Sequence, residues 1–278
     1  MTISYFIRIK NFLNIENFRI RSITTLILFS FFSLLFWLGE LFMSLFFIFL
    51  FVGVLYELKL NFSKKVTSFH KIQILIIPFL LFLCLICEVN KIGFENLYID
   101  NYDIFLASAI VLSVLFFGSL SNVFYSIISI LVVISFFSII QILLSTNGLY
   151  IVFYLVVLVT SMDIFAYIGG NIFGKIKIAP SISHGKTVEG TIIGLFFTII
   201  MSIVLKDIVS VSFTNAIFLG LVIGILAFLG DLIESIFKRK VGVKDSGTLI
   251  PGHGGLLDRF DGYLLLGPFT FLFFNFLI

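Results

Sequence analysis

The chain has 278 residues, of which 60% are hydrophobic and only 12% are charged. An ordinary soluble domain carries about 25% charged residues, so this composition excludes a soluble globular fold and indicates a membrane protein. The net charge of +3 is modest, and we expect no nucleic-acid partner. With only two cysteines, Cys84 and Cys87, the chain cannot form a disulfide framework or supply the ligands of a structural zinc site.

Apolar stretches recur along the chain at the length that a membrane span requires. A helix that crosses the bilayer core needs about 20 apolar residues, and nine stretches reach or approach this length. We expect residues 1–22 to be a cytoplasmic or interfacial segment, residues 23–148 a transmembrane scaffold, and residues 149–278 a transmembrane region that holds the functional site. The predicted spans are Ile23–Leu38, Leu41–Leu58, Ile72–Cys87, Ile104–Leu120, Val123–Leu144, Leu149–Ile168, Val188–Leu205, Asn215–Phe237 and Phe260–Ile278.

Basic residues are distributed unevenly about these spans. With a cytoplasmic N-terminus, 16 of the 18 lysines and arginines fall on the cytoplasmic side, and only Lys91 and Lys206 on the other. This is the bias that the positive-inside rule describes. We therefore predict an all-α polytopic membrane protein with about nine transmembrane helices and a cytoplasmic N-terminus. The short N-terminus favours a bacterial cytoplasmic (inner) membrane, with an organellar inner membrane as the alternative.

Acidic residues collect in the C-terminal region, on or next to the predicted cytoplasmic face. Two of them, Asp163 and Asp231, lie within apolar helices, where a carboxylate costs about 2.5–3.5 kcal/mol on insertion scales. A buried hydrogen bond that packs two helices together is the simpler explanation for an acid at these positions. The insertion cost favours a functional role instead. The seven residues are Asp163, Glu189, Asp231, Glu234, Asp245, Asp258 and Asp261.

The spacing of these acids predicts a cation site. Asp231, Glu234 and Ser235 lie at i, i+3 and i+4 and so share one helix face. Asp258 and Asp261 are three residues apart at the start of the last predicted span. Carboxylates that face one another from two helices make an oxygen-rich pocket suited to a hard divalent cation such as Mg²⁺.

A basic, glycine-rich segment, residues 238–255, joins the two acidic pairs. Its residues Lys238, Arg239 and Lys244, together with Arg259, can hold phosphate oxygens. The glycines of Pro251–Gly255 allow backbone N–H groups to approach an anion closely. A plain cytoplasmic connector is the alternative, but it would not need alternating acids, bases and glycines.

A second polar cluster precedes the seventh predicted span. Its Gly-Lys-Thr, residues 185–187, lacks the earlier glycine and the buried strand of a Walker loop, so we reject a P-loop. Lys186 and Thr187 still stand directly before an apolar helix. They predict a helix start that contacts phosphate.

The segment from Ser235 to Asp261 resembles, over 27 residues without a gap, the signature of the phosphatidate cytidylyltransferases, or CDP-diacylglycerol synthases. Asp163-x-x-Ala166-Tyr167 and Lys186-Thr187-x-Glu189-Gly190 are similar to the same family. One segment departs from it. The family usually has Ser-Pro-Lys-Lys-Thr-Trp-Glu-Gly where this chain reads Ser-His-Gly-Lys-Thr-Val-Glu-Gly at residues 183–190, with one lysine and the tryptophan missing.

The resemblance implies a Mg²⁺-dependent reaction in which CTP and phosphatidate give CDP-diacylglycerol and pyrophosphate. It also implies a second, monovalent cation, with the lipid bilayer as surroundings and a homodimer as one possible assembly. We expect Asp231 and Asp258 to bind the metal, with Asp163 and Glu234 as further candidate ligands. The expected catalytic residues are Asp231, Asp258, Asp261, Lys244 and Arg259. The expected phosphate-binding residues are Lys186, Thr187, Ser235, Lys238, Arg239, Asp245, Gly252, His253, Gly254 and Gly255.

Other functions compete with this interpretation. A CTP-dependent synthase could act on a different lipid phosphate, of ether or isoprenoid type. A CDP-alcohol phosphotransferase would need further Gly and Asp residues after Asp261, which an apolar helix replaces. An ion-coupled transporter would spread its acids across the membrane depth, whereas here they gather at one face.

Overall fold

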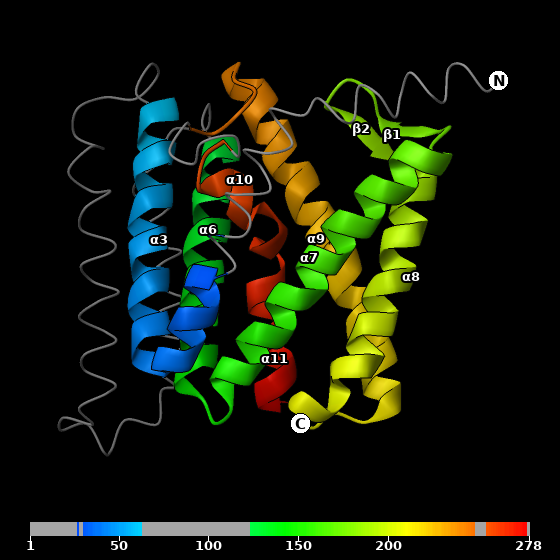
Figure 1. Ribbon diagram of the computed structural model, residues 1–278. Helices are drawn as coiled ribbons and strands as arrows, with labels where there is room; N and C mark the ends of the chain where they lie inside the picture. Colours follow the sequence, from blue (N-terminus) through cyan, green and yellow to red (C-terminus); the bar gives the residue numbers. More distant parts are fainter. Residues whose placement is uncertain (1–26, 28–29, 63–122, 248–253, 277–278) are drawn as a thin grey trace.

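The structure, a computed structural model, describes residue 27 and residues 30–62, 123–247 and 254–276. A helical segment at residues 30–38 precedes α3, and Gly39, with a φ of 95°, separates the two. The elements (Figure 1) are α3 (Glu40–Phe62), α6 (Val123–Leu144), α7 (Gly148–Phe173), β1 (Lys177–Ala179), β2 (Ser183–Thr187), α8 (Val188–Leu205), η2 (Lys206–Ile208), α9 (Phe213–Val241), α10 (Leu257–Phe260), η3 (Asp261–Tyr263) and α11 (Leu266–Phe276).

The long helices have the length and composition of membrane spans. Four such helices occur in the described part of the chain, at Glu40–Leu58, Gly148–Phe173, Val188–Ile208 and Phe213–Val241. Each coincides with a predicted span, and together they indicate a largely helical, multi-pass membrane protein. The predicted spans Ile72–Cys87 and Ile104–Leu120, like residues 1–22, lie outside the described residues. The total of nine spans and the N-terminal orientation therefore stay predictions.

The C-terminal segment differs from the single span predicted at Phe260–Ile278. It is divided into α10, η3 and α11, and α11 begins only at Leu266. Pro268 lies in the first turn of α11, where its missing N–H is tolerated; deeper in a helix it would remove a hydrogen bond and clash with the preceding turn. A continuous helix from Phe260 would place Pro268 in such an interior position.

A β-hairpin at one end of the bundle was absent from the all-α prediction (Figure 1). β1 and β2 are antiparallel, with Lys177 opposite Thr187 and Ala179 opposite Ser183. β2 leads directly into α8, and the Thr187 hydroxyl accepts a hydrogen bond from the Gly190 amide at 3.2 Å, which caps the helix. Strands this short carry no alternating apolar pattern, so hydropathy gives no sign of them.

Glycines allow the helices that carry the site to pack closely. α8 packs against both α7 and α9, while α6 contacts α3 and α11. A Cβ on Gly194 of α8 would lie 2.8 Å from the Met162 sulfur of α7. A Cβ on Gly220 of α9 would lie 2.7 Å from the Cα of Ile199 of α8. Small residues permit such backbone approach between membrane helices, and here they bring three helices together.

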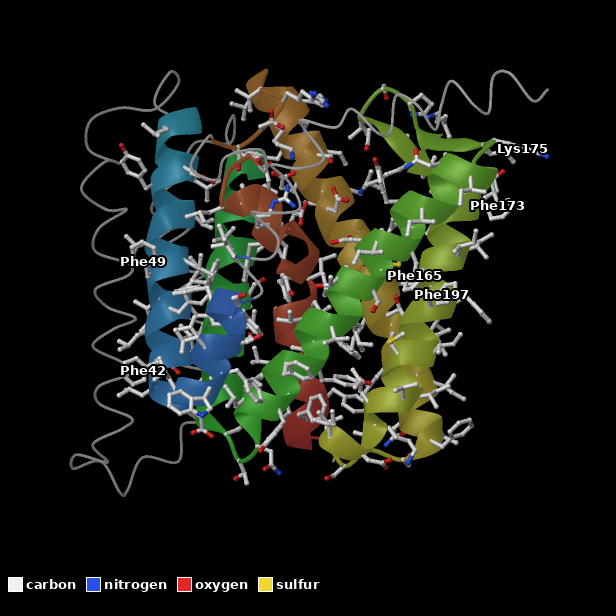
Figure 2. All side chains as sticks on the ribbon, in the orientation of Figure 1. Phe42, Phe49, Phe165, Phe173, Lys175 and Phe197 are labelled. Carbon is white, nitrogen blue, oxygen red and sulfur yellow. The ribbon has the colours of Figure 1, made fainter. Side chains whose placement is uncertain are left out.

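The many phenylalanines serve two purposes in this bundle. Phe42 and Phe49 point outward from α3, with exposed fractions of 46% and 70% (Figure 2). Phe165 of α7 and Phe197 of α8 instead stack with ring centroids 3.9 Å apart. The outward set gives the bundle the apolar exterior that lipid requires, and the inward set holds helices together.

Candidate active site

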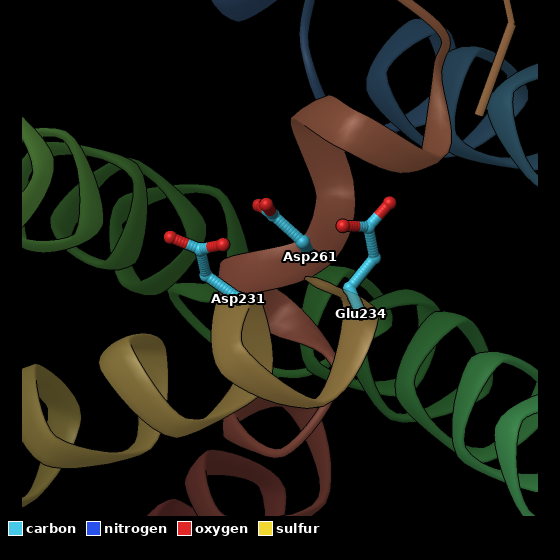
Figure 3. A group of neighbouring side chains, drawn as sticks. All are labelled: Asp231, Glu234 and Asp261. Carbon is cyan, nitrogen blue, oxygen red and sulfur yellow. The ribbon is translucent and has the colours of Figure 1, made fainter. Parts of the chain in front are cut away.

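Three carboxylates, two on α9 and one on η3, come together where these two elements meet (Figure 3). Asp231 and Glu234 belong to α9 and Asp261 to η3, and one oxygen of each lies within 4.8 Å of the others. The i, i+3 spacing places the α9 pair on one helix face. η3 can approach α9 because residue 230 is glycine: a Cβ there would lie 2.4 Å from the Asp261 carbonyl oxygen. These three residues are named the carboxylate cluster below.

Lys186, near the end of β2, reaches the carboxylate cluster. Its buried ammonium lies 2.8 Å from Asp231 Oδ2 and 4.9 Å from the centroid of the Phe228 ring. Asp163 of α7 interacts electrostatically with Asp231, Lys186 and Arg259. The intramembrane acid of α7 therefore shares its surroundings with the carboxylate cluster, and Lys186 lies against Asp231.

Lys238 of α9 links the carboxylate cluster to Asp258. Its ammonium lies 2.5 Å from Glu234 Oε2 and 2.7 Å from Asp258 Oδ1. Asp258 Oδ2 accepts hydrogen bonds from the amides of Ser246, at 2.9 Å, and Gly255, at 2.8 Å. Burial opposes ionisation of Asp258, but the hydrogen bonds from Lys238 and Gly255 outweigh it and hold the pKa of Asp258 below its ordinary value. Asp258 is therefore a carboxylate at neutral pH.

Three residues predicted to bind phosphate make internal contacts in the structure. Ser235 is buried, and its hydroxyl donates to Asp231 Oδ1 at 3.3 Å. Thr187 caps α8 and is 4% exposed. Arg239 donates from Nε to the Ile182 carbonyl at 3.1 Å, which ties the end of α9 to the hairpin. The contact of these three residues with phosphate stays a prediction.

The remaining predicted residues lie between α9 and α10 or on α10. Lys244 and Asp245 are exposed just after α9, and Arg259 is exposed on α10. Gly254 has a φ of 81°, and a Cβ on it would lie 2.5 Å from Asp258 Oδ2. Gly255 holds Asp258 through its amide. Gly252 and His253 lie outside the described residues.

Glu57 of α3 contacts this region, although it belongs to residues 23–148, which were predicted to be transmembrane scaffold. It is 2% exposed and accepts a hydrogen bond from the Leu256 amide at 2.8 Å. An acid within an otherwise apolar span is rare, and this rarity also singled out Asp163. The presence of this acid in an apolar run was the signal that could have identified Glu57.

Comparisons with known proteins agree with the motifs. The model of the cytidylyltransferase family matches residues 19–277. The chain is similar to the phosphatidate cytidylyltransferase of Staphylococcus aureus (strain COL), with 43% identity over 125 residues, which cover 44% of this chain and 48% of the relative. The phosphatidate cytidylyltransferase of Haemophilus influenzae is 40% identical over 138 residues, 48% of each chain.

A third relative, the uncharacterized protein YnbB of Escherichia coli (strain K12), is 41% identical over 128 residues, which cover 46% of this chain and 43% of the relative. The chain thus spans about half the length of the curated relatives that it matches. The family model, in contrast, extends over nearly the whole sequence. The chain belongs to the cytidylyltransferase family.

Proposed function

We propose that this protein is a phosphatidate cytidylyltransferase, which converts CTP and phosphatidate to CDP-diacylglycerol and pyrophosphate at the cytoplasmic face of a bacterial inner membrane. The observation that carries the proposal is the carboxylate cluster with Lys186 and Lys238 beside it, set among apolar helices. The names of the relatives support the choice of substrates. A site of this kind suits two phosphorylated substrates, one of which is a lipid.

The proposed reaction needs positioning more than proton transfer. A phosphate monoester carries a charge of about −1.5 to −2 at neutral pH, so the phosphatidate oxygen is a ready nucleophile without a general base. This oxygen forms a bond to the α-phosphorus of CTP while the bond from that phosphorus to the oxygen bridging to the β-phosphorus breaks. Pyrophosphate leaves with the electron pair. The protein has to bring two anions together and offset their charge.

A divalent cation is part of the proposal, and the residues present fit one. The carboxylate cluster offers three hard oxygen ligands, and Glu234 Oε1 is buried without a hydrogen-bond partner among the described residues. Asp231, Glu234 and Asp261 would hold Mg²⁺, which when bound neutralises charge on the triphosphate. Asp258 stays a predicted ligand: in the structure its oxygens already bind Lys238, Ser246 and Gly255. The second, monovalent cation also stays a prediction.

Basic residues would hold the phosphates of both substrates. Lys186 and Lys238 already stand against carboxylates, so their charges are fixed in place before a substrate arrives. Arg259 is exposed on α10 and interacts electrostatically with Asp163. Lys244 is exposed on the segment that follows α9. We assign these four residues to neutralising the triphosphate and the lipid phosphate.

The test is CTP-dependent conversion of phosphatidate by the purified protein in detergent, with and without Mg²⁺. We expect CDP-diacylglycerol and pyrophosphate in equal amounts, with Mg²⁺ only. Asp231→Asn should lower kcat more than about 100-fold, since even the partners of metal ligands cost 10–100-fold. Asp207→Asn is the matched control, because Asp207 is 84% exposed and lies in η2, between α8 and α9.

Two outcomes would contradict the proposal. Equal turnover by wild type and Asp231→Asn would exclude the carboxylate cluster as the catalytic site. A folded wild type that converts no phosphatidate would exclude this substrate, and ether-lipid and isoprenoid phosphates would be tested next.

A further inference from the structure

A buried carboxylate on α3 is bonded to the segment that carries Asp258. Glu57 Oε1 accepts a hydrogen bond from the Leu256 amide at 2.8 Å. Glu57 Oε2 accepts one from the Leu257 amide and one from the Ser246 hydroxyl, both at 3.0 Å. All three donors lie almost 200 residues later in the chain than Glu57: Ser246 in the segment after α9, and Leu256 and Leu257 at the start of α10. One side chain of the predicted scaffold thus satisfies three donors beside the candidate active site.

Ser246 connects Glu57 to Asp258. The Ser246 hydroxyl donates to Glu57 and accepts from the Asp258 amide at 3.3 Å. The Ser246 amide donates to Asp258 Oδ2 at 2.9 Å. Ser246 is 4% exposed, so these bonds lie out of water, where each is electrostatically stronger. Asp258 therefore takes its orientation from a residue that is itself held by α3.

The close approach of Glu57 depends on two glycines of the 235–261 signature. A Cβ on Gly255 would lie 2.6 Å from Glu57 Oε2, and a Cβ on Gly247 would lie 2.5 Å from Glu57 Oε1. Contacts this short do not occur with real Cβ atoms, so a larger residue at either position would displace the Glu57 carboxylate from its hydrogen bonds or move the segment. Gly255, predicted to bind phosphate, thus has an observed second reason to be glycine.

From these contacts we infer that Glu57 is a positioning residue for the active site, an inference that rests on the proposed function. Glu57 fixes Ser246 and the first turn of α10, and through them holds Asp258 against Lys238. Lys238 in turn bonds Glu234 of the carboxylate cluster. α3 is then part of the catalytic apparatus, because the alignment of Asp258 depends on it.

The test compares Glu57→Gln with Glu40→Gln, which changes an exposed acid at the other end of the same helix. Glutamine offers one acceptor oxygen and turns an amide donor toward groups that are themselves donors. We expect Glu57→Gln to lower kcat by about 10–100-fold, the usual effect of losing a residue that orients a site. The KM values for CTP and phosphatidate should stay within about twofold of wild type, because Glu57 contacts neither substrate.

A second measurement does not depend on turnover. In the protein without substrate or metal, the amides of Leu256 and Leu257 should exchange with deuterium about tenfold faster in Glu57→Gln than in wild type or Glu40→Gln. Exchange in α7 and α8 should be unchanged. Ser246→Ala breaks the same connection between Glu57 and Asp258 without altering α3. In the double variant, the loss of kcat should be smaller than the two single effects combined.

Unchanged exchange at Leu256 and Leu257 in Glu57→Gln would overturn the inference. Faster exchange throughout the bundle would also overturn it, because Glu57 would then stabilise the whole fold rather than position one segment. Full additivity of the Glu57→Gln and Ser246→Ala effects on kcat would show that Glu57 does not act on Asp258 through Ser246. A wild type inactive on phosphatidate would refute the proposed function, while the exchange comparison would still decide whether Glu57 anchors α10.

Discussion

Lys238 has one positive charge and two carboxylate neighbours within 2.7 Å. Its side chain is 13% exposed, and that of Glu234 is fully buried. Removing one partner of a buried ion pair costs about 3–5 kcal/mol, because the other charge is left buried without compensation. We therefore expect Lys238→Met to lower the thermal midpoint of the protein in detergent by roughly 10 °C.

The matched control for this prediction is Lys240→Met, an exposed position two residues later on α9. Adding Glu234→Gln to Lys238→Met should recover part of the lost stability, since it removes the uncompensated charge. Equal thermal midpoints for Lys238→Met and Lys240→Met would show that the ion pair contributes nothing to stability.

Individual residues were predictable from the sequence where their neighbours are local. Asp231 and Glu234 could be placed together because helix periodicity alone decides which residues share a face. Glu57 could not be placed, since its three donors follow about 200 residues later and no local pattern encodes such a contact. The pairing of Lys238 with Asp258 depends equally on how the segment after α9 folds back.

At the scale of elements, the contact between α7 and α8 depends on Gly190. A Cβ there would lie 2.5 Å from the Ala166 carbonyl oxygen and 2.9 Å from the Cα of Gly170. These are backbone atoms, so neither can move away by a change of side-chain rotamer. Gly190→Ala should cost about 1–3 kcal/mol through overpacking, seen as a lower thermal midpoint in detergent.

Gly185→Ala serves as the control for Gly190→Ala. Gly185 lies on β2, and a Cβ there would meet nothing within 4 Å. Its thermal midpoint should stay near that of wild type. If the two variants had the same thermal midpoint, the packing of α7 on α8 would not depend on a glycine at residue 190.

Helix positions followed from hydropathy more closely than helix ends did. The prediction for Val188–Leu205 coincides with α8, because Thr187 caps the helix where the apolar run begins. α9 extends to Val241, four residues past the predicted end, since Lys238–Lys240 leave the apolar run but continue the helix. The basic residues in that last turn are favourable at a helix C-terminus. Hydropathy detects the lipid-exposed length of a helix and not its hydrogen bonds.

At the scale of the whole molecule, the candidate site lies toward one end of the bundle. The C-terminal ends of α3 and α9, α10 and the hairpin lie at that end, and η2 lies at the opposite end (Figure 1). α9 has 29 residues, a length of about 43 Å, which exceeds the hydrocarbon core of about 30 Å. Its two ends must therefore face opposite sides of a membrane that it crosses.

This geometry makes the orientation of the protein a test of the proposed function, because CTP, the substrate that we propose, is found in the cytoplasm. With Cys84 and Cys87 replaced by serine, Lys240→Cys and Asp207→Cys each place one thiol at an exposed position near opposite ends of the bundle. In intact bacterial spheroplasts, a membrane-impermeant maleimide should label residue 207 and leave residue 240 unlabelled. Inside-out vesicles should give the reverse pattern. Labelling of residue 240 from outside would put the carboxylate cluster on the side without CTP, and the proposed reaction could not occur there.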